Sequence, residues 1–96
     1  MAVNNKFVTE TLNHIGSDSK SNWYVGIATN PKDRLFIDHS VDEKNGKWIH
    51  SARLNETDAR DTEKYLLDNY PFKGDTGGGI NPCYVYAYKI TSETRE

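Results

Sequence analysis

Three side chains in this sequence have types and positions suited to chemistry on an anionic group such as a phosphate. They are the phenol of Tyr24, the guanidinium of Arg34 and the carboxylate of Glu63. Tyr24 stands in a short apolar segment, and a turn signal at Asn30-Pro31 separates this segment from Arg34. Because such a turn folds a helix back beside the end of a strand, we expect the phenol and the guanidinium to share one pocket.

Tyr24 and Arg34 also have a purely structural interpretation. Tyr24 can fill a thin aromatic core, since the chain has only 35% hydrophobic residues and relies on its aromatic ones. Arg34 can pair with Asp38 at i,i+4 on its own helix. Both interpretations remain open at the level of sequence.

Glu63 lies on the longest predicted helix, four residues after Ala59 and four before Leu67. Helical geometry therefore puts its carboxylate beside the apolar stripe. A carboxylate at the boundary of the stripe reaches water or pairs with Arg60 or Lys64. A buried one needs an arginine, a tyrosine hydroxyl or a metal ion as its partner.

Hydrophobic periodicity and turn signals predict the elements that position these residues. Helices are expected at residues 4–15, 31–39 and 56–70, and strands at 23–28, 48–54 and 84–90. The first strand is nearly continuous in apolar character, which is typical of a central strand. The pattern predicts an α+β fold, with a small three-stranded sheet flanked by three helices, in a single domain over residues 1–96.

Composition limits the classes of function. The net charge of −2 and the pI of about 5.9 count against strong non-specific binding of DNA, which needs a basic balance. The single cysteine, Cys83, excludes an internal disulfide and fits a reducing compartment. No apolar run has the length of a membrane span, so we expect a cytoplasmic protein without a membrane partner.

Several short motifs together resemble the second half of the GIY-YIG nuclease signature. They are Tyr24-Val25-Gly26, Thr29-Asn30, Arg34-Leu35 and His39, with the arginine ten residues after the tyrosine, as in the family. The family places a glutamate on a later helix, and the run from Ala59 to Lys64 matches that helix in outline. The resemblance spans residues 23–67, and it implies a GIY-YIG-like fold.

The chain departs from the family pattern in two places. Residues 16–22 are polar and cannot form the G-I-Y strand that precedes Y-I-G in the family. The strand at 84–90 resembles that missing strand, which implies a permuted order of elements. Alternation puts Tyr84, Tyr86 and Tyr88 on one face, and we choose the central one, Tyr86, as the counterpart of the family's first tyrosine. The second departure is His39, which lies five residues after Arg34 where the family has four.

The resemblance implies metal-dependent endonuclease chemistry, with Tyr24, Arg34, His39 and Tyr86 as catalytic residues. Glu63 would hold one Mg²⁺ ion, which binds oxygen ligands and keeps several waters. Arg34 would bind the non-bridging oxygens of the phosphate through charge-assisted hydrogen bonds. Tyr24 would orient or deprotonate the attacking water, a role that needs a nearby cation because a free phenol has a pKa near 10.

Glycines are the last candidates for binding a phosphate or another ligand. Gly26 belongs to the Y-V-G motif, and Gly77 and Gly78 belong to a glycine run that leads into the tyrosine-rich strand. Such a run can direct main-chain N–H groups at an anion. It can equally be a plain connector, since glycine is common in turns.

Two functions of different classes follow from these observations. In the first, the chain binds and cleaves nucleic-acid phosphodiester bonds. In the second, it is a non-catalytic module on the same fold that binds a nucleotide or a protein, such as an inhibitor encoded by a phage or mobile element. The negative net charge suits the second function if the partner protein has a basic surface.

Overall fold

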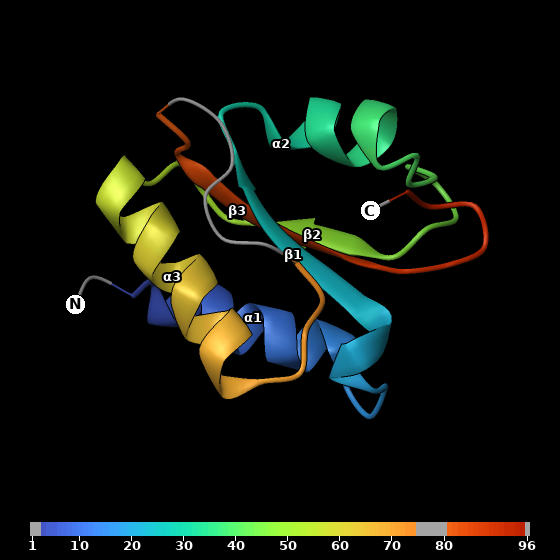
Figure 1. The fold of residues 1–96 in the computed structure, drawn as a ribbon, viewed down its shortest axis with the longest axis horizontal. Coiled ribbons are helices and arrows are strands. Elements are labelled where there is room, and N and C mark those ends of the chain that lie inside the picture. The colour runs from blue at the N-terminus through green and yellow to red at the C-terminus, as the bar shows by residue number, and fades with distance from the viewer. Residues whose placement is uncertain (1–2, 75–80, 96) are drawn as a thin grey trace.

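Three antiparallel strands form the centre of the fold in the computed structural model, which describes residues 3–74 and 81–95. The elements follow the order α1 (Asn5–Ile15), η1 (Lys20–Asn22), β1 (Trp23–Ala28), α2 (Pro31–Asp33), η2 (Arg34–Asp38), β2 (Trp48–His50), α3 (Glu56–Asn69) and β3 (Tyr84–Lys89). The strand order is β1-β3-β2 (Figure 1). The α+β class predicted from sequence is therefore confirmed.

The predicted bounds of β1 are correct, but its predicted central place is wrong. The central strand is β3, which pairs with β1 on one side and β2 on the other. β1 is apolar throughout because packed side chains cover both of its faces. Its outer edge is also covered in part, since the N–H of Val25 donates to the carbonyl of Lys73 and the N–H of Lys73 donates to that of Trp23, both over 2.9 Å.

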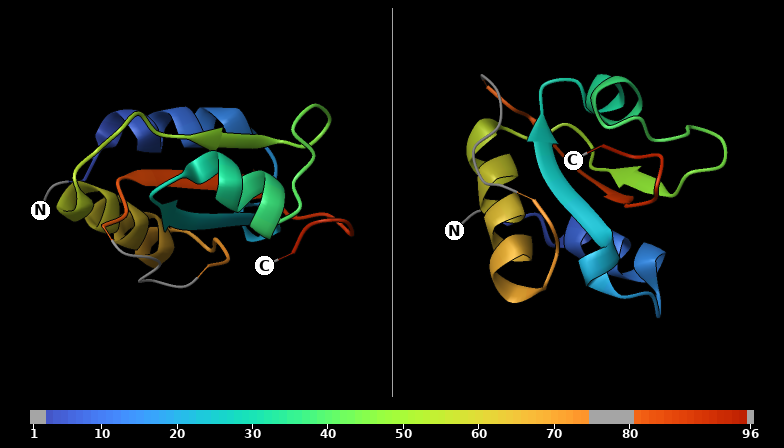
Figure 2. Two further views of the ribbon diagram at one scale, coloured as in Figure 1. Left: turned by 90° about the horizontal axis from the view of Figure 1, so that it is seen from above. Right: turned by 45° about the vertical axis from the view of Figure 1, so that its right-hand side comes forward.

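Helices α1 and α3 cover one face of the sheet, and α2 with η2 lies on the other (Figures 1 and 2). The first core contains Trp23, Val25, Ile27, Val85 and Ala87 from the sheet, with Phe7, Val8, Ile15, Ala59 and Leu66 from the helices. The second core contains Ala28, Leu35, Val41, Tyr86 and Tyr88. The strand period of two assigns alternate residues to these two cores.

Asparagines begin all three α-helices, as the sequence pattern predicts for two of them. The side chains of Asn4, Asn30 and Asn55 each accept a main-chain N–H of the first turn, at 2.9, 3.2 and 2.7 Å. α1 ends at Gly16, whose φ of 62° lies in the left-handed region that favours glycine. The Asn30 cap fixes where α2 begins, and therefore where Arg34 lies.

Two predicted elements differ from those observed. The strand expected at residues 48–54 ends at His50, because the hydroxyl of Ser51 accepts the N–H of Val85 at 3.0 Å where a main-chain carbonyl would continue the ladder. The helix expected at 31–39 is α-helical only to Asp33 and continues as a π-type turn over Arg34–Asp38. In the part of the chain that the structure describes, no helix is both long and apolar enough to cross a membrane.

Candidate functional site

Four aromatic side chains gather on the face of the sheet beneath η2, and we call them the tyrosine–histidine cluster: Tyr24, His39, Tyr86 and Tyr88. The His39 ring lies 4.9 Å from the Tyr24 ring, 5.5 Å from Tyr86 and 4.8 Å from Tyr88, measured between centroids. Strand pairing brings the tyrosines together, because Tyr24 stands opposite Tyr88 in the register of β1 and β3.

Gly26 makes room for the phenol of Tyr86. The two residues are direct partners across β1 and β3, and a Cβ atom on Gly26 would lie 2.5 Å from the Tyr86 hydroxyl. The absence of a side chain therefore lets the phenol lie across β1. This gives Gly26 a steric role, while its contact with a phosphate or ligand stays a prediction.

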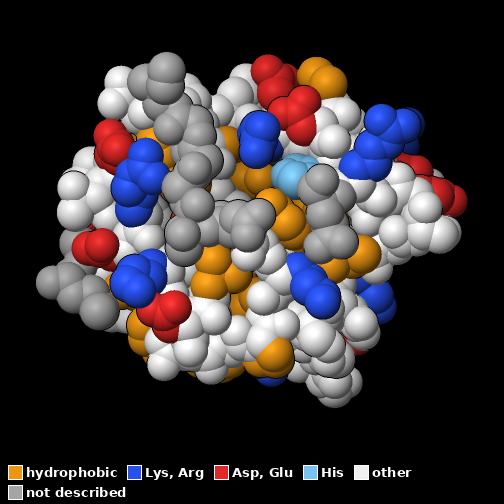
Figure 3. Space-filling view, viewed as in Figure 1, with side chains coloured by type: hydrophobic (Ala, Val, Ile, Leu, Met, Phe, Trp, Pro, Cys, Tyr) orange, Lys and Arg blue, Asp and Glu red, His pale blue; other side chains and the backbone are white. Residues whose placement is uncertain are grey.

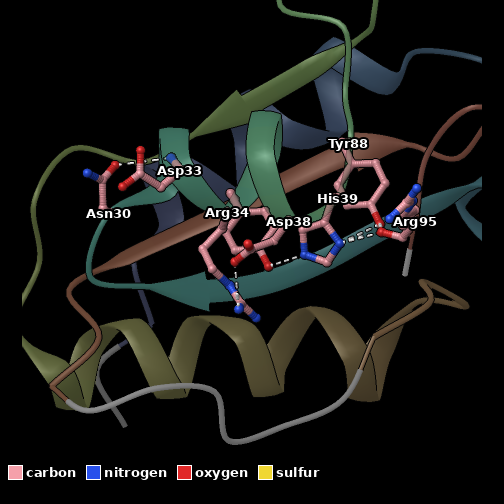
Figure 4. Close-up of polar contacts among 8 residues, drawn as sticks. Asn30, Asp33, Arg34, Asp38, His39, Tyr88 and Arg95 are labelled. Carbon is pink, nitrogen blue, oxygen red and sulfur yellow. Dashed lines mark hydrogen bonds and ion pairs between the residues drawn. The ribbon is translucent and has the colours of Figure 1, made fainter.

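His39 connects Tyr86 to the C-terminal segment. Its Nε2 lies 2.7 Å from the Tyr86 hydroxyl, and its Nδ1 lies 2.6 Å from the carbonyl oxygen of Arg95. Tyr88 donates to the same carbonyl at 3.0 Å (Figure 4). The imidazole is only 4% exposed, so these partners determine its protonation state.

The π-type turn accounts for the unusual spacing between Arg34 and His39. The N–H of His39 donates to the carbonyl of Arg34 over 2.8 Å, an i→i+5 bond. In an α-helix the bond joins residues four apart. The five-residue spacing between Arg34 and His39 therefore corresponds to one wider turn, and His39 lies one turn along from Arg34.

Arg34 makes the ion pair with Asp38 that was one of the two alternatives left open by the sequence, and its second partner is the Tyr86 hydroxyl. Its Nη1 pairs with Asp38 at 3.1 Å, and the side chain is 44% exposed (Figure 4). Burial by itself would lower its pKa, but interactions with the Tyr86 hydroxyl and with Asp38 raise that pKa above the ordinary value. The guanidinium thus stands at the rim of the cluster with part of its surface open to solvent.

Glu63 is buried, with 2% of its surface exposed. The interpretation as a boundary residue that reaches water or pairs along its helix is therefore wrong. The nearby cations have other partners, since Arg60 pairs with Glu56 at 2.8 Å and Lys64 pairs with Asp68 at 2.8 Å. Helix α3 packs on β1 and β3, which brings the carboxylate into electrostatic range of the cluster.

The pKa of Tyr86 depends on burial and on the charged groups around it. Burial raises the pKa of its phenol to about 12; the nearby Arg34 opposes this shift, and the charges of Tyr24 and Glu63 add to it. The phenol is therefore protonated at neutral pH and acts as a hydrogen-bond donor. Since Arg34 stabilises the phenolate and Glu63 disfavours it, a change in either charge would change the acidity of Tyr86.

Most of the predicted site residues thus lie together. The Tyr24 ring packs near the rings of His39 and Tyr86, and His39 is hydrogen-bonded to Tyr86. The charges of Arg34 and Glu63 both act on the Tyr86 phenol. Gly77 and Gly78 lie outside the described residues. Tyr88, one of the three tyrosines that alternation places on this face, also belongs to the cluster, and the Arg95 carbonyl is a partner that the sequence did not indicate. The alternation of the last strand was the available signal for Tyr88, whereas nothing in the sequence marks a main-chain carbonyl.

A metal ion at this site would have few protein ligands. Within residues 3–74 and 81–95, no group of three or more His, Cys, Asp or Glu side chains is placed to hold a metal ion. Glu63 would therefore be the single carboxylate ligand. A single carboxylate is compatible with Mg²⁺, which retains several of its waters and needs few protein oxygens.

The surface seen in Figure 3 carries Lys and Arg side chains interspersed with Asp and Glu around hydrophobic groups. This mixture agrees with the net charge of −2 and differs from the basic face of a non-specific DNA binder. A separate hollow of about 280 Å³ is lined by Thr29, Asn30, Pro31, Lys32, His50 and Tyr84. None of the predicted site residues that the structure describes contributes to its lining.

Comparison with known proteins gives no relative from which a function could be transferred. No family model matches the chain, and no curated protein or solved structure is significantly similar to it. The candidate site therefore stands on its own geometry.

Proposed function

We propose that this chain is a GIY-YIG-like domain that binds nucleic-acid phosphodiesters and hydrolyses them with a divalent metal ion. The observation that carries the proposal is the meeting of Arg34, His39 and Tyr86, with the charge of Glu63 within range. Arg34 lies in η2 and His39 directly follows that element, while Tyr86 comes from β3 and Glu63 from α3, so three separate parts of the chain meet here. Structural residues that merely fill a core need no such set of titratable groups.

The strand arrangement supports the permuted order inferred from sequence. β3 pairs with β1 in an antiparallel register, and it carries Tyr86 opposite Gly26 of the Y-V-G motif. The strand that resembles the family's G-I-Y strand is thus a direct neighbour of the strand that carries Y-V-G. A chain reordered in this way keeps the two tyrosine-bearing strands together.

Arg34 is suited to bind the phosphate. Its guanidinium is always charged, and a forked donor matches the oxygens of a phosphodiester. About half of its side chain is buried, which positions the group, and the remaining surface is open to a ligand. Asp38 competes for the guanidinium, so binding of a phosphate would require Arg34 to exchange or share this partner.

Glu63 would hold the metal ion, which supplies stabilisation of the negative charge that develops on the leaving oxygen. The carboxylate lies on a rigid helix and is buried, so its direction is fixed before any ligand binds. Such preorganisation lowers the reorganisation needed during the reaction.

Proton transfer would run from water through Tyr86 to His39, with Tyr24 orienting the water. Because the phenol is protonated at neutral pH, it can accept a proton from water only as it gives its own proton to Nε2 of His39. The water oxygen then bonds to phosphorus, and the P–O bond to the leaving oxygen breaks. The leaving oxygen takes a proton from solvent, and His39 later returns its proton to solvent.

The test is Mg²⁺-dependent cleavage of end-labelled single- and double-stranded DNA and RNA. We expect Glu63→Gln to lower the rate by about 10²- to 10³-fold, the usual effect of losing one preorganised charge-stabilising contact. Asp68→Asn is the matched control, since Asp68 lies on the same helix but is exposed and paired with Lys64. Absence of cleavage of all these substrates by the wild-type protein would reject the nuclease.

A non-catalytic binding module is the second candidate function. The hydroxyl of Tyr86 is already engaged by His39, and the negative net charge suits a basic partner protein. In that case nucleotides or a partner would bind without being changed, and Glu63→Gln would leave the binding affinity nearly unaltered. Binding and cleavage measured on the same labelled oligonucleotides separate the two functions.

A further inference from the structure

We propose that the main-chain carbonyl of Arg95 sets the tautomer of His39, with the hydrogen on Nδ1, so that Nε2 is the acceptor for the Tyr86 hydroxyl. Arg95 is then a positioning residue for proton transfer, and it acts through its main chain. This inference deepens the proposed function and rests on it for its catalytic meaning. The tautomer itself is a property of the folded chain without substrate.

The first argument is the chemistry of the partner at Nδ1. A carbonyl oxygen can only accept a hydrogen bond, and it lies 2.6 Å from Nδ1 of His39. A buried contact of this length between two acceptors would be repulsive, so Nδ1 must carry the hydrogen. The neutral imidazole then has its lone pair at Nε2, where the Tyr86 hydroxyl donates over 2.7 Å.

The second argument is that the carbonyl is held in place from two sides. The N–H of Arg95 donates to the carbonyl of His39 at 2.7 Å, so the two residues are joined at both their main chains and the imidazole. Tyr88 also donates to the Arg95 carbonyl, at 3.0 Å. The carbonyl therefore cannot turn away from His39 without breaking two hydrogen bonds, one with His39 and one with Tyr88, and the N–H bond of Arg95 holds the adjoining peptide in place.

The third argument is the path of the segment between β3 and Arg95. The Thr94 hydroxyl accepts the N–H of Thr91 at 3.0 Å and donates to the Thr91 carbonyl at 3.1 Å. The N–H of Thr94 donates to the same carbonyl at 3.3 Å. These bonds close a turn that returns the chain to the cluster, where Figure 4 shows His39 and Tyr88 facing the main chain of Arg95.

The consequence is a directed chain of hydrogen bonds. Tyr86 donates to Nε2 of His39, while Nδ1 donates to Arg95, and the positive charge of Arg34 lies near the phenol. The opposite tautomer would place a hydrogen on Nε2 and remove the acceptor for the phenol proton. A segment far from β1 and α3 in sequence thus decides whether His39 can receive a proton from Tyr86.

The test is ¹⁵N NMR of the imidazole nitrogens in the ligand-free protein at a pH where His39 is neutral. We expect Nδ1 to resonate as a protonated, pyrrole-type nitrogen and Nε2 as a pyridine-type nitrogen. The excess over the other tautomer should be at least about tenfold, the factor that one hydrogen bond of ordinary net strength supplies. A dominant Nε2–H tautomer in the wild-type protein would overturn the proposal.

Deletion of residues 92–96 should lower this tautomer ratio several-fold in a chain whose amide spectrum shows the native fold. An unchanged ratio in the folded deletion variant also overturns the proposal. Should the deletion variant not fold, the full-length Thr94→Val variant replaces it, because the valine removes both hydroxyl bonds of the turn. The ratio should then fall in part, and an unchanged ratio counts against the proposal in the same way.

Tyr88→Phe distinguishes the effect of the Arg95 carbonyl on the His39 tautomer from that of Tyr88. The Tyr88 hydroxyl is the other neighbour of Nδ1 and lies 3.1 Å from that nitrogen. We expect the tautomer to persist in this variant, and its reversal would assign the role to Tyr88. Tyr84→Phe is the matched control on the same face of β3, and it should leave the ratio unchanged. Because no step uses a substrate, these results can fail independently of the cleavage assay.

Discussion

The main-chain N–H of His39 donates to the carbonyl of Arg34, five residues earlier, over 2.8 Å. This single wide turn puts the imidazole and the guanidinium on the same side of η2, where both reach Tyr86. π-type turns are often found at functional sites. The bond therefore explains how a histidine five residues after Arg34 comes to lie in the cluster.

Deletion of Ile37 should convert the π-type turn into an α-helical one. Ile37 is 71% exposed, so its removal takes away no core contact. The histidine is then four positions after Arg34, so its N–H and the Arg34 carbonyl can form the ordinary i→i+4 bond of an α-helix. We expect the free energy of unfolding to change by less than about 1 kcal/mol.

The measurement is denaturant unfolding of the deletion variant together with NMR contacts between the imidazole and the Tyr86 ring. Loss of those contacts in a folded variant would show that the wide turn itself is needed. Deletion of Leu35, which is fully buried, is the contrasting variant and should prevent folding.

Gly26→Ala should destabilise the protein by about 1–3 kcal/mol, the usual cost of overpacking a filled site. The added Cβ would lie 2.5 Å from the Tyr86 hydroxyl and 2.6 Å from the adjoining ring carbon. Denaturant unfolding measures the loss. In a Tyr86→Ala background the same substitution should cost much less, and additive effects in this double-mutant cycle would refute the steric coupling.

Stability at high pH should depend on Tyr86. Its pKa is raised to about 12 in the folded protein, mainly by burial, whereas an unfolded tyrosine titrates near 10. The contribution to stability is therefore fully present below pH 10 and is lost as the pH rises toward 12. The shift of two units corresponds to about 2–3 kcal/mol.

The check is the free energy of unfolding at a series of pH values from 8 to 12, for wild type and Tyr86→Phe. The variant should lose less stability than wild type across this range. Equal slopes for the two proteins would mean that the phenol titrates in the folded state as it does in the unfolded chain.

Asp18→Asn should weaken the protein at neutral pH and remove part of its sensitivity to acid. Hydrogen bonds from Lys89 at 2.9 Å and from the Trp23 indole at 3.0 Å hold the pKa of Asp18 far below its ordinary value. A carboxylate with a lowered pKa stabilises the fold above its unfolded pKa, near 4, and this stabilisation is lost as the pH falls below that value.

Thermal unfolding at pH 7 and at several values below 4 measures this effect. The difference in melting temperature between wild type and Asp18→Asn should shrink as the pH falls. Asp33→Asn serves as the control, since it removes the same charge from an aspartate in the first turn of α2.

Sequence patterns alone predict the first and last helices, the first and last strands and the shared face of the three tyrosines on the last strand, because periodicity and capping are local. The sequence also indicated Tyr24, Arg34 and Glu63 through residue types at fixed spacings. It misplaced β1 as a central strand, since an edge strand with both faces covered has the same apolar character as a central one.

The contacts between these residues depend on the tertiary structure. The burial of Glu63 depends on how α3 packs against the sheet. Its position along the helix is compatible with either a solvent-exposed or a buried carboxylate. The contact of His39 with Tyr86 joins residues 47 positions apart, and the partner at Nδ1 is a main-chain carbonyl. Every residue has such a carbonyl, so residue types carry no sign of it, and only the folded path of the chain selects Arg95.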